Sequence, residues 1–215
     1  VAVTDTDMDA LTAAQSIYPE LHIFQADVTD AAAMTAVFDS LMNLWGRLDV
    51  LMANAGIAGP TASIENITLE DWKRCLAVNL DGSFLAANLA VPIMKAQRSG
   101  VITLTSSTAG EWGYPFRSPY ATAKWGIIGL MKTLAMELGA FGIRVNAICP
   151  GSVEGERMDG VIKREAAARG ISVEELQKGY ADCASLRRFV TAEDVADMAI
   201  FLASPKARSV SGMAM

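Results

Sequence analysis

Five short apolar segments alternate with longer segments of helical pattern, and this alternation limits the possible folds more than any other feature. The apolar segments are residues 1–5, 21–25, 48–53, 101–105 and 143–148, all of strand length. Helices are predicted over residues 9–17, 30–45, 69–97, 119–140 and 192–202, with Thr29, Thr68 and Thr191 as N-caps. Strands that alternate with helices form a parallel sheet with right-handed crossovers. The sequence therefore predicts an α/β fold with a doubly wound parallel sheet, in a single domain.

Composition argues against several classes of function. The chain has a net charge of −6 and a pI of about 4.8, without a basic patch, so nucleic acid and anionic membranes are poor partners. Three scattered cysteines and a single histidine, His22, suggest no metal site, no disulfide framework and no histidine-based catalysis. No apolar run reaches the length of a membrane span, and no leader opens the chain. We expect reduced thiols and a cytoplasmic protein.

Residues 152–188 differ in amino-acid composition from the rest of the chain. Charges of both signs are interleaved with few large apolar residues, and several glycines interrupt the segment. Structureless loops of this length are uncommon in compact domains, so we expect short surface helices that form a substrate lid rather than a linker. Arg157, at its start, could meet a substrate carboxylate or pair with a neighbouring acid, and the pairing is favoured.

Tyr120 and Lys124 are four residues apart in a predicted helix, so their side chains share one face, one turn apart. A lysine ammonium beside a tyrosine favours the phenolate and makes the tyrosine a usable general acid–base. Such a pair also arises by chance, as a solvated lysine beside a half-buried tyrosine. Ser107 strengthens the catalytic interpretation, because it follows a predicted strand and would emerge at the carboxyl end, where open α/β sheets bind ligands.

Ser107, Tyr120 and Lys124 in this arrangement resemble the active site of the short-chain dehydrogenase/reductases, and the resemblance covers nearly all of the chain. It implies a Rossmann-like, dinucleotide-binding fold and hydride transfer between NAD(H) and a secondary alcohol or ketone. Tyr120 would exchange the proton, Ser107 would polarise the substrate oxygen, and Lys124 would also bind the nicotinamide ribose. Asn79, unusual inside a long helix, would bend that helix and hold a relay water; the alternative is a solvent-facing asparagine.

Asp5 ends the first predicted strand, where an acid in this architecture accepts hydrogen bonds from the adenosine ribose and repels a 2′-phosphate. Asp5-Thr6 offers no arginine for that phosphate, so NAD is favoured over NADP; the alternative is an ordinary loop aspartate. The resemblance implies further cofactor-binding residues. Without the resemblance, the same residues could equally have structural roles. These are Asp27, Val28, Asn54, Ala55, Gly56, Tyr120, Lys124, Pro150, Gly151 and Val153.

The family pattern also has a strand, a glycine-rich pyrophosphate turn and a helix before residue 1, and a last strand beyond residue 215. The earlier strand is expected in the middle of the sheet, between the strands at residues 1–5 and 48–53. Residues 1–215 are therefore expected to form one dinucleotide-binding oxidoreductase domain without those parts, which folds poorly and binds dinucleotide weakly on its own. The competing class is a non-catalytic protein of this fold that has lost its pyrophosphate loop and acts in binding or assembly. The argument against this class is that a non-catalytic protein would not need Ser107, Tyr120, Lys124 and Asn79 together.

The expected partner is a small-molecule alcohol or ketone, and no metal is expected. Trp112, Tyr114 and Phe116 could line a pocket for an apolar or cyclic substrate, or could pack beneath the lid. The resemblance also implies a homo-oligomer, a tetramer or a dimer, built partly on the predicted helices over residues 69–97 and 119–140.

Overall fold

The computed structural model describes all residues from 1 to 215 and confirms the predicted alternation of strands and helices. The strands are β1 (Ala2–Asp5), β2 (His22–Gln25), β3 (Val50–Ala53), β4 (Gly100–Thr105) and β5 (Ile143–Ile148). The helices are α1 (Met8–Ile17), α2 (Ala31–Trp45), α3 (Leu69–Leu76), α4 (Gly82–Gln97), α5 (Ser118–Leu138), α6 (Glu156–Arg169), α7 (Val173–Cys183) and α8 (Ala192–Ala203). Every strand pair is parallel, as the α/β prediction requires.

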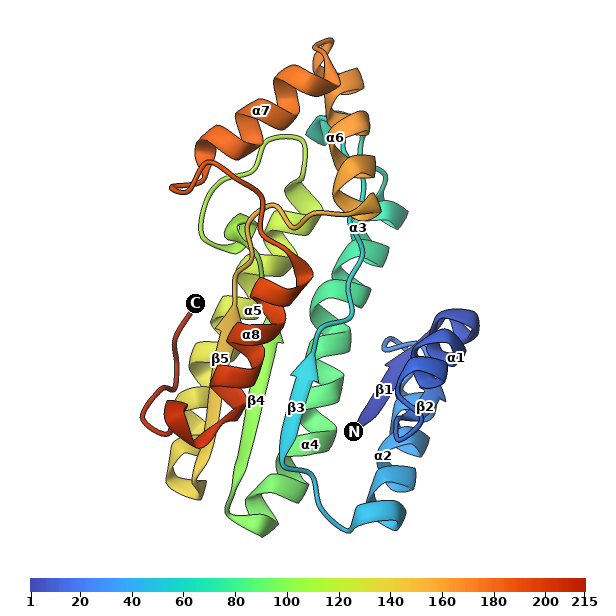
Figure 1. The fold of residues 1–215 in the computed structure, drawn as a ribbon, viewed down its shortest axis with the longest axis vertical. Helices are drawn as coiled ribbons and strands as arrows, with labels where there is room; N and C mark the ends of the chain where they lie inside the picture. Colours follow the sequence, from blue (N-terminus) through green and yellow to red (C-terminus); the bar gives the residue numbers. More distant parts are fainter.

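The strands form two separate sheets, β1–β2 and β3–β4–β5. In Figure 1 the blue pair lies to one side of the larger sheet. The facing edges of β1 and β3 have no strand partner, and Val3 on β1 and Met52 on β3 are 36% and 38% exposed. The prediction of a further strand between them is untested.

Helices cover both faces of the larger sheet. Helix α8 crosses in front of β4 and β5 in Figure 1, while α4 and α5 lie behind them. The apolar core fills the space between this sheet and α2, α4 and α5, with Ile102, Ile127 and Val145 completely buried. The last residues of the chain run beside β5, where Ala147 and Ala214 form a parallel bridge.

The long helix predicted over residues 69–97 is continuous but irregular. A π-helical turn, Ala77–Asp81, separates α3 from α4 and contains Asn79, so the predicted local distortion is present. By length and composition alone these 29 residues could span a membrane, which corrects the expectation that no segment could. The helix instead packs on β3, β4 and α5 inside a globular domain.

Helix α2 begins one residue later than predicted, because its N-cap is Asp30 and not Thr29. The Thr29 hydroxyl and N–H both donate to the Asp27 carboxylate, at 2.8 Å each, which draws the Thr29 side chain toward Asp27. Asp30 accepts from the N–H groups of Ala32 and Ala33 in its place. The predicted caps Thr68 and Thr191 are confirmed.

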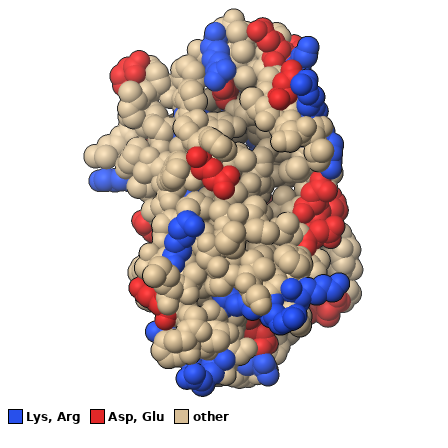
Figure 2. All heavy atoms as spheres, turned by 90° about the vertical axis from the view of Figure 1, so that its left-hand side faces the viewer, with Lys and Arg blue, Asp and Glu red and all other residues tan.

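Residues 152–188 form two helices, α6 and α7, which lie at the top of Figure 1 above the carboxyl ends of the larger sheet. The predicted short surface helices are therefore present. On the face drawn in Figure 2, side chains of both charges are scattered among large uncharged areas.

Candidate active site

Helix α5 carries Tyr120 and Lys124 on one face, as their spacing predicts. The Lys124 ammonium nitrogen lies 5.6 Å from the centroid of the Tyr120 ring and donates to the Thr105 carbonyl oxygen at 2.7 Å. Lys124 is only 3% exposed. Burial, with the positive charge of Arg157 as the second cause, lowers the pKa of Lys124 to about 8. The alternative of a solvated lysine is therefore wrong.

Asn79 approaches Lys124 from the π-helical turn. Its amide nitrogen donates to the carbonyl oxygens of Cys75 at 2.9 Å and Ile57 at 3.1 Å. Its Oδ1 is fully buried and has no hydrogen-bond partner. A Cβ added to Gly56 would lie 2.6 Å from this oxygen and 3.7 Å from the Lys124 nitrogen. Asn79 and Lys124 thus meet beside Gly56, and a buried acceptor without a partner there suits an ordered water.

Ser107 follows β4 at the carboxyl end of the sheet, as predicted. Its hydroxyl donates to the Pro150 carbonyl at 3.5 Å and accepts from the Ala109 N–H at 3.2 Å. The preceding residue connects this loop to α5, because the Ser106 hydroxyl donates to the Lys124 carbonyl at 2.8 Å. The segment after β4 is therefore fixed against α5 one residue from Ser107.

Most of the predicted adenosine-binding residues line one cavity of about 320 Å³, beyond the carboxyl ends of β1, β2 and β3. Its walls include Asp5, Asp27, Val28, Ala55 and Gly56. The N–H of Thr29 and then its hydroxyl stabilise the Asp27 carboxylate and hold its pKa below the usual range. A cavity with these two carboxylates and a bare glycine suits the adenosine half of a dinucleotide.

The remaining predicted residues lie along the neighbouring strand ends. Asn54 follows β3 and accepts from the Thr105 hydroxyl at 3.0 Å, which links β3 to β4. Pro150 and Gly151 follow β5, and Pro150 accepts from the Thr108 N–H at 3.0 Å. Val153 forms a parallel bridge with Val190. These contacts are structural, and the predicted cofactor roles of these residues are untested.

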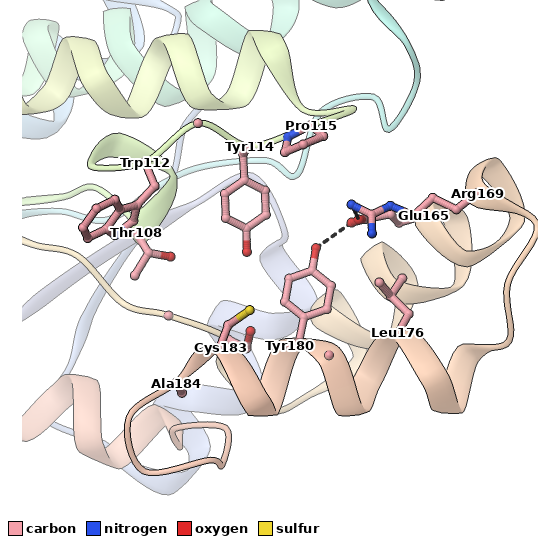
Figure 3. A pocket seen from close by; sticks show the side chains of 14 residues that line it. Thr108, Trp112, Tyr114, Pro115, Glu165, Arg169, Leu176, Tyr180, Cys183 and Ala184 are labelled. Carbon is pink, nitrogen blue, oxygen red and sulfur yellow. Dashed lines mark hydrogen bonds and ion pairs between the residues drawn. The ribbon is translucent and has the colours of Figure 1, made fainter.

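A second cavity, of about 530 Å³, lies between the loop after β4 and the two helices α6 and α7. Figure 3 shows Trp112 and Tyr114 on one side and Tyr180 on the other, with Leu176 beside it. Tyr180 donates to Glu165 at 2.5 Å, and Glu165 also pairs with Arg169 at 2.8 Å. This cavity contains Trp112 and Tyr114 of the predicted aromatic wall.

Phe116 is not part of that wall and lies instead under the Arg169 guanidinium, whose carbon is 5.5 Å from its ring centroid. Arg157 takes part in none of the ion pairs of the structure, so the favoured pairing with a neighbouring acid is wrong.

Two arginines near the site were missed from the sequence. Arg74, on α3, lines the adenosine-side cavity and contributes its positive charge to lowering the pKa of Asp27. Arg117 lies three residues before Tyr120, and its guanidinium carbon is 4.6 Å from the centroid of the Tyr120 ring. Helical spacing points to Arg117 only once the start of α5 is known, and no local pattern points to Arg74.

Comparison with known proteins shows which family and which folds this chain resembles. A family model described as enoyl-(acyl carrier protein) reductase matches residues 1–215. Trans-4-hydroxycyclohexanecarboxylate dehydrogenase from Sinomonas cyclohexanicum is 37% identical over 186 residues, which are 86% of this chain and 65% of that protein. This chain thus spans slightly less than two thirds of that relative.

Two solved structures have the same fold over the whole of this chain. A xylitol dehydrogenase with bound NAD+ gives a TM-score of 0.94 at 27% identity, and the match covers 86% of it. An actinorhodin polyketide ketoreductase with NADPH also gives 0.94, at 28% identity and 84% coverage. These three proteins are oxidoreductases by name, which supports the oxidoreductase prediction over the non-catalytic alternative, although one relative that is 39% identical over 187 residues is named an inactive dehydrogenase.

Proposed function

Because this chain belongs to the short-chain dehydrogenase/reductase family, we propose that it interconverts a secondary alcohol and a ketone with NAD(H) at the site centred on Tyr120. The observation that carries the proposal is the buried ammonium of Lys124 beside the Tyr120 ring, next to the unpartnered oxygen of Asn79. A buried cation next to a tyrosine favours its phenolate, and an acceptor without a partner suits a water that carries protons.

Each residue has a separate task in this mechanism. The bound nicotinamide supplies the hydride acceptor or donor. Tyr120 takes the alcohol proton during oxidation and returns it during reduction. The single O–H of Ser107 turns from the Pro150 carbonyl, 3.5 Å away, and donates to the same substrate oxygen. Lys124 uses one of its three N–H donors on the Thr105 carbonyl, which leaves two for the nicotinamide ribose and a relay water. Asn79 would hold that water through its Oδ1.

The test is turnover with NAD and a panel of secondary alcohols, measured on the full-length gene product. Tyr120→Phe removes only the hydroxyl, and we expect turnover to fall by about 10²–10⁴-fold, as is typical for loss of a general acid–base. Tyr18→Phe is the matched control, because Tyr18 is 56% exposed and lies outside both cavities. Near-normal turnover in Tyr120→Phe would rule out this mechanism.

NAD is the proposed cofactor in preference to NADP. The support is the Asp5 carboxylate at the end of β1, in the same cavity as Asp27, since a carboxylate accepts from ribose hydroxyls and repels a 2′-phosphate. Titration of both dinucleotides, followed by tryptophan fluorescence, should give tighter binding of NAD. Asp5→Asn should narrow the difference between the two affinities. Tighter binding of NADP by the unaltered protein would contradict the proposal.

The second cavity is proposed to hold the apolar part of the substrate. Its aromatic and aliphatic side chains, Trp112, Tyr114, Leu176 and Tyr180, suit an uncharged ring, and its carboxylate, on Glu165, is already paired with Arg169. Thr108 and Gly151 in its lining adjoin Ser107 and Pro150, which connects it to the reacting centre. We expect cyclic alcohols to have lower KM values than open-chain alcohols of equal carbon number, and Tyr114→Ala to remove the difference.

A homo-oligomer in the cytoplasm is also proposed. The oligomer is supported by large apolar side chains that α4 and α5 leave exposed, with Phe84 at 53%, Trp125 at 51% and Met136 at 87%. The cytoplasmic location is supported by the three free thiols. Light scattering should give the mass of a dimer or tetramer, and Trp125→Glu should lower it. A monomeric mass for the unaltered protein would refute the oligomer.

A further inference from the structure

Arg117 is the closest cation to the Tyr120 ring. Its guanidinium carbon lies 4.6 Å from the ring centroid, compared with 5.6 Å for the Lys124 nitrogen. Arg117 is the N-cap residue of α5, but its side chain does not cap the helix. It is only 5% exposed, so the positive charge and the ring meet largely out of contact with water.

No acid compensates the charge of Arg117. The four ion pairs of the structure involve Arg47, Arg169, Arg187 and Arg188. One guanidinium nitrogen of Arg117 donates to the Ala58 carbonyl at 2.9 Å, while its Nε is buried without a partner. A buried cation is costly unless something negative faces it, and the face of an aromatic ring is the negative group that the structure provides.

Several other titratable groups lie around this centre. Arg117, Lys124 on α5 and Arg157 on α6 all act on the Cys75 thiol on α3, and the Cys149 thiol after β5 acts on Lys124. Arg117 also acts on the Tyr114 phenol, on which the Glu165 carboxylate acts too, and Glu111 acts on Cys149. Neither carboxylate forms an ion pair with Arg117.

The backbone before Arg117 is held in an unusual conformation. Phe116 has a φ of 61°, in the left-handed region that bulky residues rarely adopt. Its carbonyl accepts from the Ala62 N–H at 3.0 Å, so the loop that contains Ala58 is attached both to the backbone of Phe116 and to the side chain of Arg117. Strained backbone of this kind persists where the surrounding structure fixes it, commonly at functional sites.

We propose that Arg117 is a positioning residue that holds its positive charge against the Tyr120 ring and favours the phenolate form. This inference rests on the proposed function, in which that phenolate accepts the proton of the alcohol. Ionisation places negative charge on the ring, so the attraction to a cation above the ring grows when the proton leaves. Arg117 therefore shares with Lys124 the task of keeping Tyr120 reactive.

Two substitutions separate charge from hydrogen bonding. Arg117→Lys keeps the charge, and Arg117→Gln keeps an N–H donor for the Ala58 carbonyl but is neutral. The rate of alcohol oxidation should rise with pH as Tyr120 ionises. In Arg117→Gln we expect that rise to move to higher pH and turnover on its acid side to fall about tenfold, whereas Arg117→Lys stays close to the unaltered protein. Arg117→Met, also neutral, replaces the glutamine variant if that variant does not fold.

A spectroscopic measurement tests the same claim without turnover. Tyrosinate absorbance is titrated in the unaltered protein, in Arg117→Gln and in Tyr120→Phe, and the signal absent from Tyr120→Phe belongs to Tyr120. The proposal requires this signal to appear at higher pH in Arg117→Gln. It is overturned if the midpoint does not move, or if the lysine and glutamine variants move it equally, since Arg117 would then act only through its hydrogen bond or shape. The titration needs no substrate, so it tests the role of Arg117 alone. Failure of the proposed dehydrogenase mechanism is seen in a different measurement, as near-normal turnover of Tyr120→Phe.

Discussion

The buried ammonium of Lys124 gives the protein a measurable pH dependence of stability. The pKa of Lys124 falls from its ordinary 10.5 to about 8 in the folded state, chiefly through burial. A tenfold change in proton affinity is worth about 1.4 kcal/mol. Holding Lys124 charged in the folded protein therefore costs about 3 kcal/mol at neutral pH. Little solvent screening reduces this figure, because the side chain is only 3% exposed.

The sign of the effect follows from the direction of the change in pKa. Between pH 8 and about 10.5 the folded protein releases the Lys124 proton and the unfolded chain keeps it, so the unfolded state binds more protons and stability rises with pH. Below pH 8 both states hold the proton, and the full cost is present. Lys124→Met has no ammonium at this position and therefore lacks this rise.

The assay is urea unfolding of the unaltered protein and of Lys124→Met at several pH values from 7 to 10, without cofactor. The stability advantage of Lys124→Met should shrink by about 2.5 kcal/mol across this range, because pH 10 still lies below the ordinary lysine pKa of 10.5. Loss of the hydrogen bond to the Thr105 carbonyl adds only a constant offset, and other groups that titrate at high pH cancel in the difference. Parallel pH profiles for the two proteins would show that the ammonium is not desolvated.

Two further substitutions test the packing of the site. In Gly56→Ala the added carbon would lie 2.6 Å from the Asn79 Oδ1, so we expect weaker NAD binding and lower turnover by titration and steady-state assay. Gly139→Ala, whose added carbon would meet nothing within 4 Å, should leave both unchanged. Tyr180→Phe removes a donor 2.5 Å from the buried Glu165 carboxylate, and urea unfolding should show a loss of about 1–3 kcal/mol. An unchanged unfolding midpoint would show that another donor replaces the hydroxyl.

The parts of the site that depend on spacing within one element could be predicted from the sequence. Tyr120 and Lys124 share a face because they are one turn apart on α5, and Asn79 marked an irregular turn because an amide is unfavourable inside a regular helix. The strands could be predicted because β4 and β5 are almost wholly buried and carry several large apolar residues, although Arg144 and Asn146 interrupt the apolar sequence of β5.

Contacts between distant segments could not be predicted. The prediction places the N-cap of α2 at Thr29, whereas the Asp30 carboxylate accepts from the first N–H groups of the helix, and residue type alone does not show which of two adjacent capping residues does so. The Glu165–Tyr180 hydrogen bond joins α6 to α7, and the Arg117 contact with Ala58 joins segments 59 residues apart. Such pairs depend on how elements pack, which a single sequence does not specify.

Arg74 shows how one such contact bears on a functional inference. The preference for NAD was argued from Asp5-Thr6, where no arginine is present, yet Arg74 enters the same cavity from α3. A cation in this cavity binds a 2′-phosphate if its charge is not already neutralised. The charge of Arg74 also acts on Asp27, because Arg74 helps to lower the pKa of that carboxylate. If Asp27 engages it, Arg74→Gln should leave the ratio of NAD to NADP affinity unchanged. A selective loss of NADP affinity would show that the arginine is free to bind phosphate and that the acid at the end of β1 does not decide the cofactor alone.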